Sequence, residues 1–178
     1  MDILVTRRLS LRPPIAYDAD DIALWLANPT VARMLARVPQ PYHRRDAADW
    51  IGSVRQGDDD VFTIHRERLI GVASIEYGLG HAELGYWLGA PWHGKGFMTE
   101  ALGALLAHVF EKRDLSEIRS SAFAGNRASL RVQEKLGFAI TGTADIWSVP
   151  RQAMVGAVTT RLTRAAFFAA RSIQAEAA

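Results

Sequence analysis

The sequence contains no cysteine among its 178 residues, and this absence excludes several kinds of chemistry. Without cysteine there are no disulfide bridges, no thiolate metal sites and no cysteine nucleophile. The five histidines occur singly, at positions 43, 65, 81, 93 and 108, and they lack the spacing of metal ligands. We therefore expect a protein that works without a bound metal ion.

Long apolar runs and a large net charge of one sign are also missing. The longest apolar run, residues 101–109, contains His108 and is far shorter than the roughly 20 residues of a membrane-spanning helix. Residues 1–8 have no apolar segment after a basic stretch, so they do not resemble a secretory signal. The formal net charge of +2 is too small to indicate nucleic-acid binding. We expect a cytoplasmic protein with neither a membrane nor a nucleic acid as its partner.

What the sequence does contain is typical of a globular protein, with 49% hydrophobic and 22% charged residues. The length suits one well-formed core, and we expect a single domain over residues 1–178. Alternating apolar residues predict strands at 9–13, 61–64, 69–75, 82–88, 115–123, 138–141 and 157–162. Apolar stripes at helical spacing predict helices at 18–26, 31–35, 44–54, 97–113 and 126–136, and an alanine-rich helix at the end of the chain.

Two strands carry features that break a regular pattern. The strand at 9–13 stops at Pro13, which is typical of an edge strand. Gly85 and Gly89 weaken the strand at 82–88 and favour a β-bulge there. An antiparallel meander followed by strand–helix–strand units predicts a mixed sheet covered by helices, and therefore an α+β fold.

Residues 92–100, with the sequence WHGKGFMTE, join a predicted strand to the clearest predicted helix. Gly94 and Gly96 allow a sharp turn and leave the backbone N–H groups uncovered. These groups lie at a helix start, where the helix dipole also favours negative charge. Lys95 adds a positive charge between the two glycines. The stretch indicates a cradle for phosphate or pyrophosphate, with a tight turn and a solvated lysine as the alternative.

Residues 126–138, with the sequence NRASLRVQEKLGF, form the second informative stretch. Asn126 and Ser129 place an amide and a hydroxyl on the first turn of a helix that ends at Gly137. Taken alone, this pattern describes a capped helix with a polar first turn.

Together the two stretches resemble the GNAT acetyltransferase superfamily. Residues 94–96 match the end of its acetyl-CoA signature, Gln/Arg-x-x-Gly-x-Gly/Ala, and residues 126–138 resemble its later helix motif. Within the superfamily the sequence is most similar to the RimJ/RimL-type N-terminal acetyltransferases, through residues 6–12, 83–88 and 94–101. The resemblance covers about residues 5–165, and the motifs follow in the order and spacing of that branch.

This resemblance implies the GNAT fold, which is a single mixed, mostly antiparallel twisted sheet with helices on both faces. It also implies acetyl-CoA as the cosubstrate, without a metal ion. The helix start would hold the pyrophosphate, the preceding strand end would contact the pantetheine arm and the acetyl carbonyl, and the later helix would contact pantetheine. The residues assigned in this way to acetyl-CoA binding are Trp87, Leu88, His93, Gly94, Lys95, Gly96, Phe97, Met98, Thr99, Asn126 and Ser129.

Three positions depart from the family pattern. Pro91 stands where the acetyl-CoA signature often has Gln or Arg, so the phosphate grip falls to backbone N–H groups and Lys95. Gln133 stands where some relatives carry a tyrosine thought to protonate the leaving thiolate, and an amide cannot do this. Ser148 lies at about the point where some RimL-type enzymes place a glutamate. The chemistry on the acceptor side is therefore not transferable from the resemblance.

Acetyl transfer from a thioester to an amine requires a neutral amine, a polarised carbonyl and a stabilised thiolate. The family transfers the acetyl group directly, without an acyl-enzyme, which agrees with the absence of cysteine. Glu83 is the candidate base, directly or through a water, with a structural ion pair to an arginine as the alternative. Ser129 is the candidate hydrogen-bond donor to the leaving sulfur, with a plain capping hydroxyl as the alternative. If neither acts, positioning and desolvation carry the rate.

We expect an acetyl-CoA-dependent N-acetyltransferase whose acceptor is a primary amine, most simply the N-terminal amine of a protein or peptide. A small amine, such as an amino acid, a polyamine or an aminoglycoside, is the alternative within the same chemistry. A non-catalytic acyl-CoA-binding sensor on the same fold is the alternative from another class. Both a monomer and a homodimer are compatible with the sequence.

Overall fold

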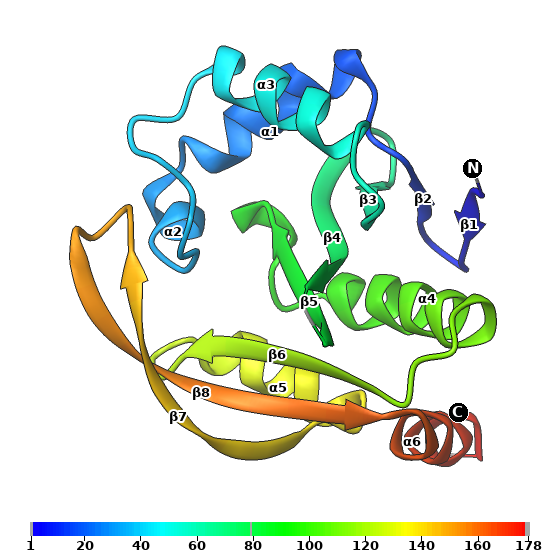
Figure 1. Cartoon of the computed structure of the whole chain (residues 1–178). Helices are drawn as coiled ribbons and strands as arrows, with labels where there is room; N and C mark the ends of the chain where they lie inside the picture. The colour runs from blue at the N-terminus through cyan, green and yellow to red at the C-terminus, as the bar shows by residue number, and fades with distance from the viewer. Residues whose placement is uncertain (1, 79, 177–178) are drawn as a thin grey trace.

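The computed structural model describes residues 2–78 and 80–176, which build one eight-stranded sheet with helices around it (Figure 1). The N-terminal part contains β1 (Leu4–Val5), β2 (Ser10–Arg12), the 3-10 turn η1 (Ala16–Asp18), α1 (Ala19–Leu26), α2 (Pro29–Ala32) and α3 (Arg44–Val54). The middle contains β3 (Asp60–His65), β4 (Leu69–Gly78), β5 (His81–Leu88), the 3-10 turn η2 (Ala90–Trp92) and α4 (Phe97–Lys112). The C-terminal part contains β6 (Glu117–Phe123), α5 (Arg127–Lys135), β7 (Ala139–Ser148), β8 (Ala153–Thr163) and α6 (Arg164–Glu176).

The sheet is mixed, as the sequence predicts. Its strand order is β1-β2-β3-β4-β5-β6-β8-β7, and the only parallel pair among the described strands is β5 with β6. The expected fold class, a single mostly antiparallel sheet combined with helices, is confirmed. The single domain over residues 1–178 stays a prediction, and residues 1, 79, 177 and 178 of that span lie outside the described part.

Two hydrophobic clusters fix the helices to the sheet. The larger one joins β2 to β6 with the apolar stripe of α4 and with Phe167 of α6, whose ring lies 5.6 Å from that of Phe110. The smaller one joins α1, α2 and α3 to Leu69 and Trp87. Figure 1 shows α1, α2 and α3 grouped together, apart from α4 and α6. The helices that would carry the cofactor and the helices of the N-terminal part are thus separate units around the central strands.

Helix α4 matches its prediction closely because its periodic apolar residues are completely covered. Ala101, Leu102, Leu105 and Leu106 are fully buried. The helix has 16 residues, and in the described ranges no helix is both long enough and apolar enough to cross a membrane.

Two of the strand predictions are wrong in instructive ways. β2 is not an edge strand, because β1 pairs with it on the outer side through Leu4 and Leu11. A β1 of two residues is too short to produce a recognisable alternation. The bulge expected in β5 is also missing, since the pairing of β4 with β5 runs without a register shift from Gly71 opposite Leu88 to Gly78 opposite His81.

The strands predicted at 138–141 and 157–162 are in fact the ends of a long hairpin, β7 and β8. Their pairing extends from Ala139 opposite Arg161 to Ser148 opposite Ala153. Between the two predictions, residues 142–148 and 153–156 also belong to these strands, and residues 149–152 form the turn that joins them. Because β7 lies at the sheet edge and most of its side chains are exposed, it lacks the apolar alternation that identifies a half-buried strand.

The tip of this hairpin contacts the chain between α2 and α3. The Val149 N–H donates to the Ala36 carbonyl at 2.8 Å, and Arg151 Nε donates to the Arg33 carbonyl at 2.8 Å. The Arg151 guanidinium also lies 5.0 Å from the centre of the Phe123 ring at the end of β6. The hairpin tip therefore connects the C-terminal strands to the chain that follows α2.

Candidate active site

The central feature of the site is a separation between β5 and β6. Their parallel pairing consists of Glu83 opposite Arg119 and Leu84 opposite Ser120, although β5 continues to Leu88 and β6 to Phe123. Backbone groups of the unpaired ends therefore face a gap instead of a neighbouring strand.

The backbone at the end of β5 is oriented by its contacts to β4 and to His93. Gly89 donates its N–H to the Ile70 carbonyl at 2.8 Å, so the preceding residue, Leu88, directs its N–H to the other side, toward β6. The Leu88 carbonyl lies 2.7 Å from His93 Nε2, which must donate because a carbonyl only accepts. The site thus offers a backbone N–H in the gap, at the place where the sequence analysis expects the acetyl carbonyl.

The glycine stretch forms the predicted tight turn into α4. Gly94 and Gly96 both have positive φ angles, +73° and +77°, in the left-handed region that favours glycine. The first hydrogen bond of the helix runs from Glu100 N–H to the Gly96 carbonyl at 3.1 Å. Helix geometry therefore leaves the N–H groups of residues 97–99 without an acceptor inside the helix. These groups and the helix dipole provide the charge pattern that a pyrophosphate requires.

Side chains at this turn divide into ligand-facing and core-facing groups. Phe97 and Met98 are buried in the main core, so only their backbone N–H groups can reach a ligand. Lys95 is exposed, and its ammonium lies 5.6 Å from the centre of the Trp92 ring. Thr99 is half-buried on the first turn of α4.

Arg8 forms hydrogen bonds to the turn at residues 94–99 and to Glu100, although it belongs to neither of the two informative stretches, 92–100 and 126–138. Its Nη1 donates to the Lys95 carbonyl at 3.2 Å, and its Nε donates to the Glu100 carboxylate at 2.6 Å. Glu100 also accepts from the Thr6 hydroxyl at 2.6 Å and from the Arg8 backbone at 2.8 Å. Burial raises the pKa of Glu100, but these hydrogen bonds outweigh burial and leave the pKa below its ordinary value. The Glu100 carboxylate, which would otherwise repel a phosphate at this turn, is thereby neutralised by an ion pair with Arg8.

The start of α5 is capped by Asn126, as predicted. Its Oδ1 accepts from the Ser129 N–H at 3.2 Å. The Ser129 hydroxyl takes no part in this cap, and it lies 2.6 Å from the Tyr86 hydroxyl of β5. Gln133, one turn further along α5, donates to the Tyr86 hydroxyl at 3.2 Å. The sequence singles out Ser129 and Gln133, whereas Tyr86 is a site residue that the sequence analysis missed.

Glu83 and Tyr86 lie on opposite faces of β5. Leu84 and Leu88 belong to the main core and Tyr86 packs against it, whereas Trp87 packs against the cluster of α1, α2 and α3. Side chains alternate along a strand, so Glu83 shares the face of Trp87. The candidate base and the candidate donor to the sulfur are therefore separated by the strand itself.

Glu83 is exposed and lines a groove of about 570 Å³ on the face of β5, β6, β7 and β8. The groove also contains Glu117, which accepts from Arg119 and Arg161, each at 3.2 Å. Among the residues that the structure describes, Glu83 has no arginine, lysine or histidine nitrogen within 4.0 Å of its carboxylate. The alternative that Glu83 serves in a structural ion pair thus has no direct contact to support it.

Arg37, in the chain between α2 and α3, brings a positive charge near this face. It forms two hydrogen bonds to Glu76 of β4, at 2.6 and 2.8 Å, and Glu76 is paired with Glu83 across the strands. Hydrogen bonding to Glu76 is the main cause that raises the pKa of Arg37, and the charge of Glu83 adds to it.

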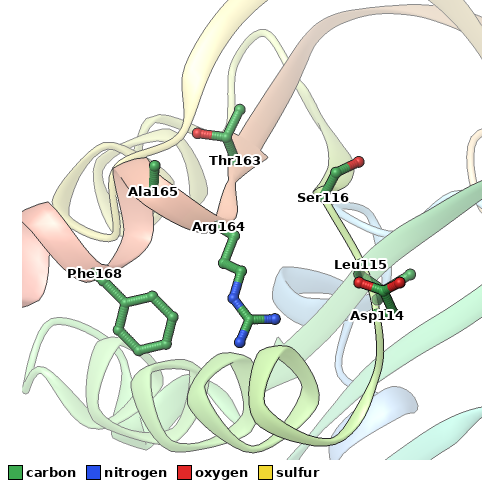
Figure 2. A pocket seen from close by; sticks show the side chains of 7 residues that line it. All are labelled: Asp114, Leu115, Ser116, Thr163, Arg164, Ala165 and Phe168. Carbon is green, nitrogen blue, oxygen red and sulfur yellow. The ribbon is translucent and has the colours of Figure 1, made fainter.

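A second cavity has a volume of about 850 Å³, and Figure 2 shows the side chains that line it. It is formed by the residues that precede β6, 114–116, and by the junction of β8 with α6, where Arg164 and Phe168 point into it. None of the residues proposed for catalysis or cofactor binding lines it. Across residues 2–78 and 80–176 there is also no group of three or more His, Asp or Glu residues that could hold a metal ion.

Comparisons with known proteins agree with this geometry. Residues 8–139 match the family model described as an acetyltransferase (GNAT) domain, so the chain belongs to the GNAT acetyltransferase family. Among its relatives is the uncharacterized N-acetyltransferase p20 of Bacillus licheniformis, 29% identical over 147 residues, or 78% of this chain and 83% of that protein. Another is the ribosomal protein uS5-alanine N-acetyltransferase of Escherichia coli (strain K12), 30% identical over 107 residues, or 58% of this chain and 51% of that protein.

Solved structures show the same fold. RimL, a ribosomal L7/L12 alpha-N-protein acetyltransferase in complex with coenzyme A, superposes with a TM-score of 0.80 at 20% identity, covering 91% of this chain and 98% of that one. The microcin C7 self immunity acetyltransferase MccE, in complex with acetyl-CoA and AMP, superposes with a TM-score of 0.77 at 18% identity, covering 89% and 93%. The chain is a GNAT-family N-acetyltransferase with RimJ/RimL-like relatives, as its sequence motifs predict.

Proposed function

We propose that this enzyme transfers the acetyl group of acetyl-CoA directly to the N-terminal α-amine of a protein or peptide. The observation that carries the proposal is the groove beside Glu83, which is lined by residues of β5, β6, β7 and β8 and by none of α4 or α5. An extended chain end could lie in this groove while the cofactor occupies the gap from the other side. The uS5-alanine N-acetyltransferase of Escherichia coli, whose acceptor is a ribosomal protein, supports the same class of acceptor.

For the cofactor, we assign the pyrophosphate to the turn at residues 94–99 and the pantetheine arm to the gap between β5 and β6. Lys95 and the backbone N–H groups at the start of α4 would bind the phosphates. The Leu88 N–H, directed into the gap, would polarise the thioester carbonyl. Asn126 would contact pantetheine through the amide nitrogen that its capping bond leaves available.

The amine would lose its proton to Glu83, directly or through a water molecule. An α-amino group has a pKa of about 7.7–8.0, whereas a lysine side chain has a pKa of about 10.4. At neutral pH an α-amine is therefore partly neutral already, and a weak base such as a carboxylate suffices to remove the proton from the remainder. The exposure of Glu83 favours an α-amine over a strongly basic alkylamine such as a polyamine.

Coenzyme A release should be measured with three acceptors: a lysine-free peptide that begins with alanine, a lysine-containing peptide with a blocked N-terminus, and a polyamine. We expect the first to react with the highest kcat/KM, and mass spectrometry should place the acetyl group on its α-nitrogen. Faster transfer to the blocked peptide or to the polyamine would overturn the assignment of the acceptor. With the best acceptor, Glu83→Gln and Ser129→Ala should each lower kcat by about 100-fold while acetyl-CoA still binds.

A further inference from the structure

A chain of buried hydrogen bonds connects β8 to the site through α5. It consists of Thr160, Gln133, Ser120, Tyr86 and Ser129, and we call it the polar chain. Gln133 is 1% exposed, and Ser120 and Thr160 are each 4% exposed. Buried polar side chains are tolerated only when their hydrogen bonds are satisfied, and apolar residues could fill the same space more simply. Such a network at a candidate active site indicates a requirement beyond packing.

The orientation of Gln133 follows from its two ends. Its Oε1 accepts from the Thr160 hydroxyl at 2.7 Å, which leaves the amide nitrogen for the opposite side. That nitrogen donates to Ser120 Oγ and to the Tyr86 hydroxyl, each at 3.2 Å. Ser120 passes its own hydrogen to the Leu84 carbonyl at 3.0 Å. Both hydrogens of the Gln133 amide are thus used, and the Tyr86 oxygen receives one of them.

The length of the contacts assigns the next bond. Tyr86 accepts from Gln133 and has a single hydrogen to donate. Its two acceptors are Ser129 Oγ at 2.6 Å and the Ser129 carbonyl at 3.2 Å, and we assign the hydrogen to the shorter contact. Ser129 Oγ accepts this hydrogen and keeps its own hydrogen for another partner. The Ser129 N–H is already bound by Asn126, so the hydroxyl is not needed for the helix cap. The outcome of the polar chain is a half-buried serine hydroxyl oriented as a donor.

We propose that Tyr86, held by Gln133, is a positioning residue that orients the Ser129 hydroxyl as a hydrogen-bond donor to the sulfur of the departing coenzyme A. This inference rests on the proposed function only in needing acetyl-CoA as the donor, since the leaving group is the same for every acceptor. As the amine nitrogen bonds to the acetyl carbon, the carbon–sulfur bond breaks and its electron pair stays on sulfur. Ser129 stabilises this thiolate and retains its proton, and the thiolate is protonated afterwards from solvent.

The chemistry of the tyrosine fits this role. Burial raises the pKa of Tyr86, and the hydrogen bonds to Ser129 and Gln133 offset this only in part. The phenol therefore remains protonated at neutral pH and continues to donate. Gln133 stands at the position where some relatives carry a tyrosine, so in this chain the phenol comes from β5 and the helix supplies the amide that holds it.

The test compares Tyr86→Phe with a matched control, Tyr77→Phe. Tyr77 is also a partly buried tyrosine, and its hydroxyl donates to Asp60 at 2.5 Å, outside the polar chain. We expect Tyr86→Phe to lower the single-turnover rate of coenzyme A release about 10-fold, with the Kd of acetyl-CoA changed less than 2-fold. Tyr77→Phe should leave that rate within 2-fold of wild type, whatever it does to stability. An equal loss of rate in both variants, or none in Tyr86→Phe, would overturn the proposal.

A double-mutant cycle separates positioning from a general loss of structure. If Tyr86 acts through the serine, Tyr86→Phe should have little further effect once Ser129→Ala is present. Multiplicative losses in the double variant would contradict the proposal, as would a wild-type rate in Ser129→Ala. Because these rates are measured with the best acceptor available, an unexpected acceptor would change the proposed function and leave this result intact.

Discussion

Substitution of the glycines before α4 provides a direct test of the phosphate-binding turn. Gly96 has φ +77° and Gly94 has φ +73°, whereas Gly103 lies inside α4. A Cβ at Gly94 or Gly103 would meet no atom within 4 Å, and one at Gly96 would lie 3.4 Å from Arg8 Nη2. The three sites therefore separate backbone conformation from steric contact.

The expected magnitudes follow from the backbone. An L-residue in the left-handed region costs about 1–2 kcal/mol, so Gly94→Ala and Gly96→Ala should each destabilise the protein by that amount. Inside a helix the same replacement stabilises by about 1 kcal/mol, so Gly103→Ala should have the opposite sign. In a domain of this size, 1 kcal/mol corresponds to roughly 2–4 °C in Tm. If the strained turn rotates one N–H away from a phosphate, coenzyme A affinity should fall about 10-fold or more.

Thermal unfolding and calorimetric titration with coenzyme A measure the two effects separately. We expect Gly96→Ala to lose both stability and affinity, and Gly103→Ala to gain stability at unchanged affinity. Wild-type affinity in Gly94→Ala and Gly96→Ala would refute the assignment of the turn to the pyrophosphate. Equal losses of affinity in all three variants would show that the effect comes from the fold as a whole.

Two further predictions concern electrostatics and the hairpin tip. Glu100 has a lowered pKa in the folded state, so its contribution to stability is present above its ordinary pKa of 4.5 and is lost as pH falls through the lower folded value. Urea unfolding of Glu100→Gln should therefore differ from wild type most at neutral pH and progressively less as the pH falls below the ordinary pKa of a glutamate, and a constant difference would contradict this sign. Val149→Pro removes the N–H that binds Ala36, and we expect a lower kcat/KM for the acceptor with the Kd of acetyl-CoA unchanged. If Val149→Pro instead lowered kcat/KM for the acceptor and weakened acetyl-CoA binding together, the hydrogen bond between Val149 and Ala36 would support the whole fold rather than the acceptor side alone.

The parts of the fold that the sequence predicts are those whose information is local. The stripe of α4 is visible because every third or fourth residue is buried by a single neighbouring surface. The strands at the two edges of the sheet were missed or shortened for the opposite reason. β1 is two residues long, and β7 is exposed along most of its length, so neither shows the alternation that burial imposes.

The candidate site divides in the same way. The glycine turn and the cap by Asn126 depend on neighbours in the sequence, and both were predicted. Arg8 and Tyr86 reach their partners Glu100 and Ser129 across 92 and 43 residues. No spacing rule connects such positions, because the contacts are created by the sheet order and by the packing of α4 and α5 on it.

The regular pairing of β5, where a bulge was expected, would allow one strand to serve both of the proposed substrates. Residues of even number on this strand, such as Tyr86 and Leu88, face α4 and α5, whereas Glu83 and Trp87 lie on the opposite face, where Glu83 lines the groove and Trp87 packs against α1, α2 and α3. A bulge between Glu83 and Tyr86 would shift the alternation by one residue and move either the base or the phenol to the wrong face. The continuous ladder with β4 prevents this shift. In the proposed function, the separation of donor and acceptor chemistry is therefore a consequence of strand register, and Gly85 must fit that register without breaking it.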